Sequence, residues 1–482
     1  MNTAVSDLPL CQASANEAEL RRVFERQRET ALRLRSSSAA ERIAKIKKLH
    51  DAVLAHRREF YDAAYRDYRK PPAEVDLAEL LPVIGEAKHA MRALKGWMKP
   101  QGVWPTRLTL GLKSWVQHEP RGRCLIISPW NYNVNLTFGP LVSCIAAGNT
   151  AILKPSEMTP HLTPLMGRIV KQLFSADEVA LIEGDAKVSS ALLELPFDHI
   201  FFTGAPAIGK LVMAAAAKHL TSVTLELGGK SPTIIDETAD LRLAAQTLMW
   251  GKFTNNGQTC IAPDTLYVHA GVKDEFVREC QAVLKASYGE TAQEQMSSPN
   301  LARVVNGRHT ERLAGLLADA KQRGAKVICG GEVVENECFI QPTLLENIPT
   351  DAEIQSQEIF GPLLPILPYT DLGQVLDQIN AQPKPLALYI WSRDEATIQR
   401  VLKSTSAGGT CINHCVVQFA HGNLPFGGVN NSGIGNAHGL YGFKAFSHQR
   451  AVIRTRFMIA KILFPPYTAF KSKLMDLMLK TQ

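Results

Sequence analysis

The sequence predicts an α/β protein built on doubly wound parallel sheets. Short apolar runs alternate with longer segments whose apolar residues recur at helical spacing, as in strands joined by crossover helices. In the first half of the chain, the expected strands are 124–130, 150–156, 178–184, 199–204 and 222–229, and the helices between them include 162–174 and 207–220. With 482 residues the chain exceeds one hydrophobic core, so we expect two or more domains.

A second series of the same kind follows Gly229. Its expected strands are 265–270, 326–331, 363–369 and 386–392, and its helices include 273–288 and 394–406. The first hundred residues have helical spacing, and Ser14 is a candidate N-cap for the first helix. Segments 106–120 and 444–457 alternate apolar and polar residues, which predicts two further strands in a small separate sheet.

Composition excludes several classes of protein. Hydrophobic residues make up 45% of the chain and charged residues 21%, which is typical of a globular protein in water. The net charge of +7 is spread thinly and forms no dense basic patch, so nucleic-acid binding is not expected. The sequence shows no signal-peptide pattern and no long uncharged apolar run. Nine irregularly spaced cysteines fit a reducing, cytoplasmic setting.

The C-terminal tail, residues 458–482, mixes lysines with large apolar residues. Its apolar side chains are expected to pack on their own domain or on a partner subunit. The alternative is weak contact with a membrane surface, which would make the protein peripheral to a membrane.

The stretch FTGAPAIGKL, residues 202–211, raises the question of phosphate binding. Gly204 to Lys210 fit the phosphate-loop pattern G-x-x-x-x-G-K, but Leu211 stands where that pattern needs Ser or Thr. A strand that runs into a turn and a helix places N–H donors where an anion can bind, and Pro206 suits the first helical position. An ATP loop, a different phosphate site and a plain turn all remain open at this point. If the helix packs on the sheet, Leu211 is expected to lie on its buried face.

Cys260 and Glu226 are candidates for chemistry. Cys260 follows the polar turn TNNGQT, whose backbone donors can reach its sulfur, and a reactive cysteine needs such help to lower its pKa. Glu226 ends an expected strand, where ligands bind in α/β proteins. Each residue alone is more often structural. Cys411, His414 and Cys415 lack a second ligand pair, so no metal site is expected, and His421 and His438 are candidate residues lining the site.

Taken in order, these motifs resemble those of aldehyde dehydrogenases. The matching motifs, which extend from about 116 to 450, are SPWNYNVNL with Asn131, LKPSE, TLELGGKSP with Glu226, GQTCIAPD with Cys260, EIFGPLLPI with Glu358 and Phe360, LPFGG with Phe426, and YGFKAFSHQR. The resemblance is greatest to the class 3 or fatty aldehyde branch, which includes bacterial coniferyl-aldehyde-type enzymes.

The resemblance implies the fold, the reaction and the assembly. Residues 1–105 and 121–228 would form a Rossmann-like cofactor domain and 229–440 a catalytic domain, with 106–120 and 444–457 as strands of a bridging sheet in a homodimer. Cys260 would attack a small-molecule aldehyde substrate to give a thiohemiacetal. The Asn131 amide and the Cys260 N–H would hold the oxyanion, and Glu226 would activate the water that hydrolyses the thioester.

The cofactor-binding residues also follow from the resemblance. Gly204, Gly209 and Trp130 would lie at the pyrophosphate, Lys154 and Glu157 at the adenosine ribose, Glu358 at the nicotinamide ribose, and Phe360 near the ring. An acid at the adenosine ribose favours NAD, with NADP as the alternative.

Three residues depart from the family pattern, and one of them, Asn256 before Gly257, stands at a variable position from which little follows. Ala205 removes a side-chain donor near the pyrophosphate, and Asn430 stands where the branch usually has a glycine. Two other functional hypotheses are an ATP-dependent phosphotransferase using 204–210, and a non-catalytic, membrane-associated binding protein without a low-pKa thiol.

Overall fold

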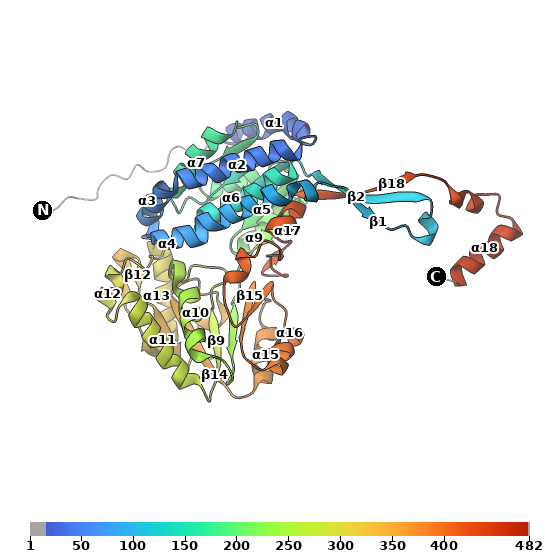
Figure 1. Ribbon diagram of the computed structural model, residues 1–482. Helices are drawn as coiled ribbons and strands as arrows, with labels where there is room; N and C mark the ends of the chain where they lie inside the picture. Colours follow the sequence, from blue (N-terminus) through green and yellow to red (C-terminus); the bar gives the residue numbers. More distant parts are fainter. Residues whose placement is uncertain (1–15, 481–482) are drawn as a thin grey trace.

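The computed structural model describes residues 16–480 and has three parts (Figure 1). Helices of the N-terminal third lie over a six-stranded sheet, a seven-stranded sheet lies beside it, and a narrow arm projects from the body. The mixed α/β fold with parallel sheets confirms the predicted fold class.

The N-terminal helices cover the six-stranded sheet. Asn16 caps the first of them, because its side chain accepts a hydrogen bond from the Glu19 N–H at 2.9 Å. The predicted cap, Ser14, lies outside the described residues. These elements are α1 (Glu17–Leu34), α2 (Ala39–Ala55), α3 (Arg57–Tyr68), α4 (Pro72–Val75), a π-helical turn η1 (Asp76–Leu80) and α5 (Leu81–Trp97).

The six-stranded sheet is doubly wound. Its strand order is β17-β7-β6-β3-β4-β5, and every neighbouring pair is parallel except β17 with β7. The strands are β3 (Arg123–Ile127), β4 (Thr150–Lys154), β5 (Val179–Leu181), β6 (His199–Thr203), β7 (Ser222–Glu226) and β17 (Gly433–Ile434); the helices are α6 (Asn133–Ala147), α7 (Leu162–Leu173), α8 (Ala186–Leu193) and α9 (Pro206–Ala217).

Helices on both faces explain why the central strands are buried throughout. All five residues of β4 and of β6 are buried, as expected for parallel strands covered on each side. One core joins these strands to α2, α5, α6 and α7, and a second core on the other face joins them to α1, α8 and α9.

Helix α9 corrects one expectation. Pro206 is its first residue, as predicted, but Leu211 is 63% exposed and does not pack on the sheet. The buried face consists instead of Gly209, Val212, Ala215 and Ala216, which recur at helical spacing. At about 100° per residue, Leu211 lies beyond the edge of that face, so the apolar character of a single residue gave the wrong face.

The seven-stranded sheet has the order β10-β13-β14-β9-β8-β15-β16 and is parallel except at β10. Its strands are β8 (Pro232–Ile235), β9 (Thr265–His269), β10 (Lys326–Cys329), β13 (Thr343–Glu346), β14 (Leu363–Tyr369), β15 (Ala387–Trp391) and β16 (Gly409–Ile412). The associated helices are α10 (Leu241–Phe253), α11 (Lys273–Tyr288), α12 (Ala292–Ser297), α13 (Gly307–Gln322), α14 (Glu353–Ser356), α15 (Leu372–Ala381) and α16 (Glu395–Ser404). A small ribbon pairs β11 (Val333–Val334) with β12 (Phe339–Ile340).

After the seven-stranded sheet, the chain returns to the six-stranded one. Gly433 of β17 pairs with Glu226 of β7, and α17 (Gly439–Ala445) packs on α5 and α6. The Gly439 N–H donates to Glu86 Oε1 at 2.8 Å. The seven-stranded sheet is therefore inserted between two segments that pack together.

The arm contains three strands where the sequence predicted two. Its order is β1-β2-β18, with β1 (Gln101–Val103), β2 (Leu112–Pro120) and β18 (Ser447–Thr455). Strand β1 was not predicted, and the first part of segment 106–120 holds a 3₁₀ turn, Arg107–Thr109, before β2 begins. A three-residue strand is too short to show a period in the sequence.

The tail beyond β18 does not pack on its own domain. It forms a 3₁₀ turn, Ile459–Leu463, and α18 (Ala469–Lys480), none of whose described residues is buried. Figure 1 shows the tail at the far end of the arm, away from both large sheets. Within residues 16–480, no helix combines the length and apolar character needed to cross a membrane.

Candidate active site

Two loops meet where the strand order of the six-stranded sheet reverses. Strands β4 and β5 lie on one side of β3, and β6 and β7 lie on the other. The loop after β3 carries Trp130 and Asn131, and the turn after β6 begins at Gly204. Ligands of doubly wound sheets bind in the crevice at this switch point.

The glycines of the turn allow close packing. A Cβ atom on Gly204 would lie 2.6 Å from a ring carbon of Phe202, and one on Gly209 would lie 2.8 Å from the Leu227 side chain. Ala205 is the N-cap residue of α9 and makes no side-chain cap hydrogen bond. The backbone N–H groups at the start of α9 are therefore the donors that this turn offers to a phosphate.

Lys154 lies at the carboxyl end of β4, close to Glu157. The Lys154 side chain is buried, and its Nζ donates to the Pro155 carbonyl at 2.8 Å. The Lys154 pKa is lowered, because the effect of burial exceeds the opposite effect of Glu157, whose Oε2 lies 3.9 Å from Nζ. The two residues lie near each other at the carboxyl end of β4, and their role at a ribose stays a prediction.

The turn from Glu358 to Phe360 belongs to the other half of the site. The Ile359 N–H donates to Asp264 Oδ2 at 2.9 Å, and the Arg312 guanidinium donates to the Ile359 carbonyl at 2.7 Å. The Glu358 carboxylate lies against Gly228, where a Cβ atom would be 2.3 Å from Oε2. These contacts fix the turn, and neither Asp264 nor Arg312 was singled out from the sequence.

An aromatic cluster joins the two halves. The Trp130 ring lies edge-to-face with Phe360 at 5.5 Å and 5.2 Å from the His309 ring, measured between centroids. His309 was missed because nothing in its local sequence distinguishes it from a surface histidine.

Cys260 follows a turn of left-handed residues. Asn255, Asn256 and Gly257 have φ values of 53°, 54° and 75°. Asparagine and glycine are the residues that adopt this conformation most readily. The backbone N–H groups of Cys260 and Ile261 act on the Cys260 thiol in the direction of a lower pKa. The predicted donor-rich environment is therefore present.

Cys260 and Glu226 line the same narrow cavity, of about 40 Å³. Its other lining residues are mostly apolar or small: Asn135, Leu136, Gly139, Pro140, Ser143, Phe201, Thr203, Leu386, Phe426, Ala437, His438, Gly442 and Phe446. His438 thus lies at the site, but His421 is exposed and does not line this cavity.

The Asn131 side chain reaches the cysteine loop. Its Nδ2 donates to the Gln258 carbonyl at 2.9 Å, whereas its Oδ1 is buried without a hydrogen-bond partner. Gln258 precedes Cys260 by two residues, so this hydrogen bond fixes the amide next to the cysteine loop.

Burial controls protonation at this site. Both carboxylate oxygens of Glu226 are buried without partners, and burial raises the Glu226 pKa well above 4.5. Burial, followed by repulsion from Asp264, raises the Glu358 pKa to about 8. Burial, followed by repulsion from Glu358 and Glu226, raises the Cys260 pKa to about 12, against the lowering effect of the two N–H groups. The expectation of a low-pKa thiol is therefore wrong for the protein without its cofactor.

The residues present fit a dinucleotide. Glu358 Oε1 and Thr203 Oγ1, the latter from a residue that lines the narrow cavity, are buried without partners, and buried polar groups normally have partners. A dinucleotide between the Gly204 turn and Cys260 would offer hydroxyl and amide groups to such atoms. When bound, the cofactor supplies an acceptor for hydride.

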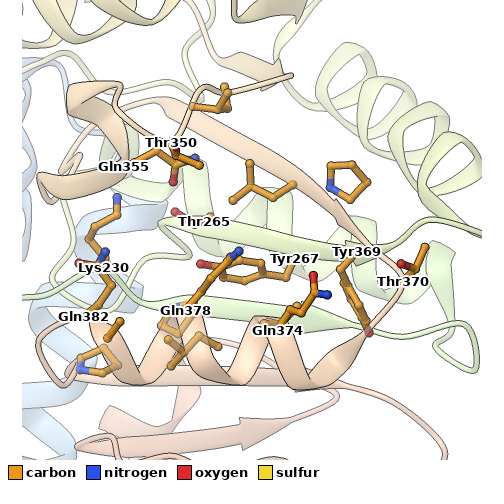
Figure 2. A pocket seen from close by; sticks show the side chains of 18 of the residues that line it. Lys230, Thr265, Tyr267, Thr350, Gln355, Tyr369, Thr370, Gln374, Gln378 and Gln382 are labelled. Atoms are coloured by element: carbon orange, nitrogen blue, oxygen red, sulfur yellow. The ribbon is translucent and has the colours of Figure 1, made fainter.

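A larger cavity of about 720 Å³ lies elsewhere, between β9, β14 and α15 (Figure 2). Its lining includes Lys230, Tyr267 and Gln378 but none of the predicted catalytic or cofactor residues. Cys411, His414 and Cys415 do not line the narrow cavity either, and the Cys415 N–H donates to His414 Nδ1 at 2.8 Å. Among residues 16–480, no three His, Cys, Asp or Glu side chains converge as metal ligands.

A switch-point crevice joined to a partly buried cysteine and a buried glutamate is typical of a dinucleotide-dependent oxidoreductase. The sequence profile of the aldehyde dehydrogenase family matches residues 5–452, and the chain belongs to that family. NAD(P)-dependent oxidation of an aldehyde is its activity, so the phosphotransferase and non-catalytic binding hypotheses are wrong.

Curated relatives place the chain near the branch suggested by its motifs. It is 41% identical to 4,4'-diaponeurosporen-aldehyde dehydrogenase of Staphylococcus aureus over 88% of this chain and 91% of that protein. It is 40% identical to a protein of Caulobacter vibrioides named for coniferyl aldehyde dehydrogenase, over 92% of each chain. It is 37% identical to aldehyde dehydrogenase family 3 member B1 of Bos taurus, over 95% and 97%.

Solved structures of aldehyde dehydrogenases are similar to this fold. The substrate-bound state of Staphylococcus aureus AldH has a TM-score of 0.91 at 38% identity, covering 95% of this chain and 99% of that one. The NAD⁺ complex of a Bacillus cereus aldehyde dehydrogenase has a TM-score of 0.83 at 27% identity, covering 92% and 90%.

The raised Glu358 pKa predicts a pH dependence of stability in the protein without cofactor. A carboxyl group with a raised folded-state pKa stabilises the fold below 4.5, and this contribution is lost as pH rises toward about 8. Each pKa unit corresponds to about 1.4 kcal/mol. The Tm of Glu358→Gln minus the Tm of the wild type should therefore increase by several degrees from pH 5 to pH 8. Thermal unfolding across this range checks the prediction, and parallel Tm curves would contradict it.

Proposed function

We propose that Cys260, Asn131 and Glu226 carry out the oxidation. The observation that carries this proposal is that Cys260 and Glu226 share one narrow cavity while Asn131 is hydrogen-bonded to the loop that carries Cys260. The Cys260 thiol releases its proton to solvent, the resulting thiolate attacks the aldehyde carbon as the carbonyl π bond opens, and the developing oxyanion accepts hydrogen bonds from the Asn131 amide and the Cys260 N–H.

Glu226 acts as the general base in the second half of the reaction. After hydride leaves the thiohemiacetal, the enzyme holds a thioester, which water must attack. A carboxylate with a raised pKa is a stronger base than an ordinary one, and burial gives Glu226 this property. Proton transfer from water to Glu226 therefore allows the acid product to leave and the thiol to be recovered.

Two substitutions test these roles. Cys260→Ala should abolish NADH production with every aldehyde, because no other group in the cavity can form the thiohemiacetal. Glu226→Gln should release about one NADH per active site in a rapid burst and then turn over at least ~100-fold more slowly, because the thioester persists. Stopped-flow absorbance of NADH measures both. Turnover by the Cys260 variant at the wild-type rate would refute the mechanism.

The substrate is proposed to be an aldehyde with an elongated apolar stem, either aromatic or aliphatic. A cavity of about 440 Å³ opens beyond the narrow one, and His438 lines both. The rim of the outer cavity includes Leu77 and Leu81, which are 55% and 52% exposed. Two similar proteins are named for aldehydes of diaponeurosporene and of coniferyl type, which supports this choice.

NAD is the proposed cofactor in preference to NADP. Glu157 lies 3.9 Å from Lys154 Nζ at the end of β4, and its charge would repel a 2′-phosphate on the adenosine ribose. The Gly204 turn, Trp130, Glu358 and Phe360 would hold the rest of the dinucleotide.

One steady-state screen tests both specificities. We expect kcat/KM to rise by about ten-fold or more from propanal to decanal and cinnamaldehyde, because each buried CH₂ contributes about 0.8 kcal/mol. With a fixed aldehyde, kcat/KM for NAD should exceed that for NADP. Equal values along the aldehyde series would argue against the apolar route, and a preference for NADP would argue against the role of Glu157.

We also propose that the arm forms a homodimer in the cytoplasm. Trp104 at the hairpin is 93% exposed, and Phe470 and Leu479 of the tail are 66% and 74% exposed. Exposed apolar residues this numerous on a thin arm favour burial against a partner. All eight cysteines within the described chain are free, which fits a reducing compartment. Weak contact of the tail with an anionic membrane surface is the second candidate, because Lys461, Lys471, Lys473 and Lys480 accompany the apolar side chains.

Truncation after Arg456 separates these roles of the tail. If the strands of the arm hold the dimer, the truncated protein remains dimeric by sedimentation equilibrium. Deleting β18 as well should give monomers. If the tail also contacts lipid, only the full chain should sediment with vesicles containing phosphatidylserine. A full-length protein that sediments as a monomer would refute the dimer.

A further inference from the structure

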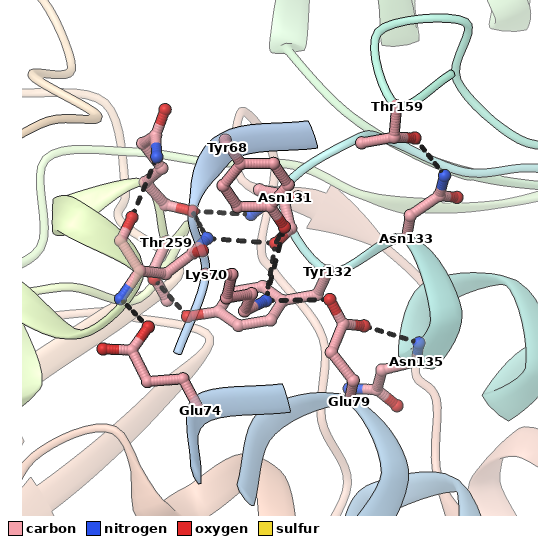
Figure 3. Close-up of polar contacts among 12 residues, drawn as sticks. Tyr68, Lys70, Glu74, Glu79, Asn131, Tyr132, Asn133, Asn135, Thr159 and Thr259 are labelled. Atoms are coloured by element: carbon pink, nitrogen blue, oxygen red, sulfur yellow. Dashed lines mark hydrogen bonds and ion pairs between the residues drawn. The ribbon is translucent and has the colours of Figure 1, made fainter. Parts of the chain in front are cut away.

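A buried ion pair lies behind the loop that carries Asn131. Lys70 Nζ is 2.8 Å from Glu79 Oε1, and the two side chains are 0% and 1% exposed. Lys70 follows α3 and Glu79 lies in the π-helical turn η1 (Figure 3). Removing two charges from water is unfavourable unless other groups form hydrogen bonds with them. The two side chains therefore need further polar partners besides each other.

Those contacts converge on the main chain of Asn131. Its carbonyl accepts hydrogen bonds from Lys70 Nζ at 3.2 Å, Tyr68 OH at 3.2 Å and Asn255 Nδ2 at 3.0 Å. A carbonyl oxygen has two lone pairs, so three donors hold this peptide group more firmly than a usual loop position. Glu79 Oε2 also accepts from the Asn135 N–H at 3.0 Å, which fixes the first turn of α6.

Tyr132 extends the network to the cysteine loop. Lys70 Nζ lies 4.2 Å from the centroid of the Tyr132 ring, which is cation–π distance. The Tyr132 hydroxyl forms a hydrogen bond of 2.6 Å with Thr259 Oγ1, and Thr259 directly precedes Cys260. Figure 3 shows this path from Glu79 through Lys70 and Tyr132 to Thr259. The network thus spans residues from both large sheets.

We propose that Lys70, Glu79 and Tyr132 are positioning residues that set the Asn131 amide against the Cys260 loop. The side chains of Lys70 and Glu79 are 0% and 1% exposed, and the Tyr132 hydroxyl is bonded to Thr259, so protein groups occupy the polar atoms of all three. They act through the Asn131 peptide group and the Thr259 hydroxyl. These two groups fix the position of the Asn131 amide, the oxyanion donor, relative to the Cys260 sulfur, the nucleophile. The inference rests on the proposed roles of Asn131 and Cys260.

The Tyr132–Thr259 hydrogen bond offers the first test. Tyr132→Phe and Thr259→Val each remove one partner and should each lower kcat for aldehyde oxidation about 10-fold, because small displacements of reacting groups have large effects on rate. KM for aldehyde and Kd for NAD should stay within about two-fold. If the hydrogen bond is the cause, the double variant should be no slower than the slower single variant.

Matched controls identify a purely structural effect. Thr259→Ser keeps the hydroxyl and should recover most of the lost kcat. Thr221→Val, matched to Thr259→Val, removes a hydroxyl that donates to the Phe197 carbonyl at 2.7 Å near the amino ends of β6 and β7, opposite the carboxyl ends where the site lies, and should leave kcat unchanged. Multiplicative effects of the Tyr132 and Thr259 substitutions, or unchanged kcat in both, would refute the proposed path.

The ion pair provides the second test. Lys70→Met leaves a buried carboxylate without its cation and should lower both Tm and kcat. Lys70→Met combined with Glu79→Gln removes both charges and keeps an acceptor for the Asn135 N–H, so Tm should recover toward that of the wild type. Because the Asn131 carbonyl still lacks the Lys70 donor, kcat should stay about 10- to 100-fold below wild type.

The outcomes separate this inference from the mechanism on which it rests. Recovery of both Tm and kcat in the double variant would show that Lys70 and Glu79 serve stability alone. If Cys260→Ala is inactive while every network variant turns over at the wild-type rate, only the positioning proposal fails. If Cys260→Ala is active, the proposed function itself fails.

Discussion

The hydrogen bond from the Asn131 amide to the Gln258 carbonyl joins two loops that come from different sheets. Residue 131 follows β3 of the six-stranded sheet, and residue 258 lies between α10 and β9 beside the seven-stranded one. Neither sheet alone forms the site. Cys260 and Glu226 share one cavity, and Trp130 packs against Phe360. Both arrangements depend on the distance between the six-stranded and the seven-stranded sheet, which this hydrogen bond helps to fix.

The site combines rigid surroundings with unsatisfied polar groups. Asn131 Oδ1, both Glu226 oxygens and Glu358 Oε1 are buried without partners, which is unfavourable for the empty protein. The surrounding cores and hydrogen bonds hold these groups in place nonetheless. Because substrate and cofactor can satisfy such groups, the unfavourable burial in the free protein becomes a source of differential binding.

The sequence predicted the fold class, the parallel strands and the glycine turn because periodic apolar runs and Gly-Pro signals are local. It failed where the answer depends on distant contacts. Leu211 is exposed because the position of a residue around the helix, and not its apolar side chain alone, decides whether it faces the sheet. The predicted direction of the Cys260 pKa shift was wrong, because desolvation and two carboxylates raise this pKa more than the backbone donors lower it. Lys70 and Glu79 resemble ordinary surface charges along the chain, and only the tertiary structure reveals that both are buried.

The return of the chain at β17 has a consequence for biosynthesis. Gly433 pairs with Glu226, and α17 packs on α5 and α6, so an edge strand and part of one core of the six-stranded sheet come from the last fifty residues of the body. A ribosome has already released residues 17–226 as nascent chain long before these segments emerge. Contacts this distant in sequence close late and at high entropic cost, so the N-terminal layer must wait, incompletely covered, for the whole inserted sheet to be synthesised. Apolar surface left exposed during such an interval makes a folding species prone to aggregation.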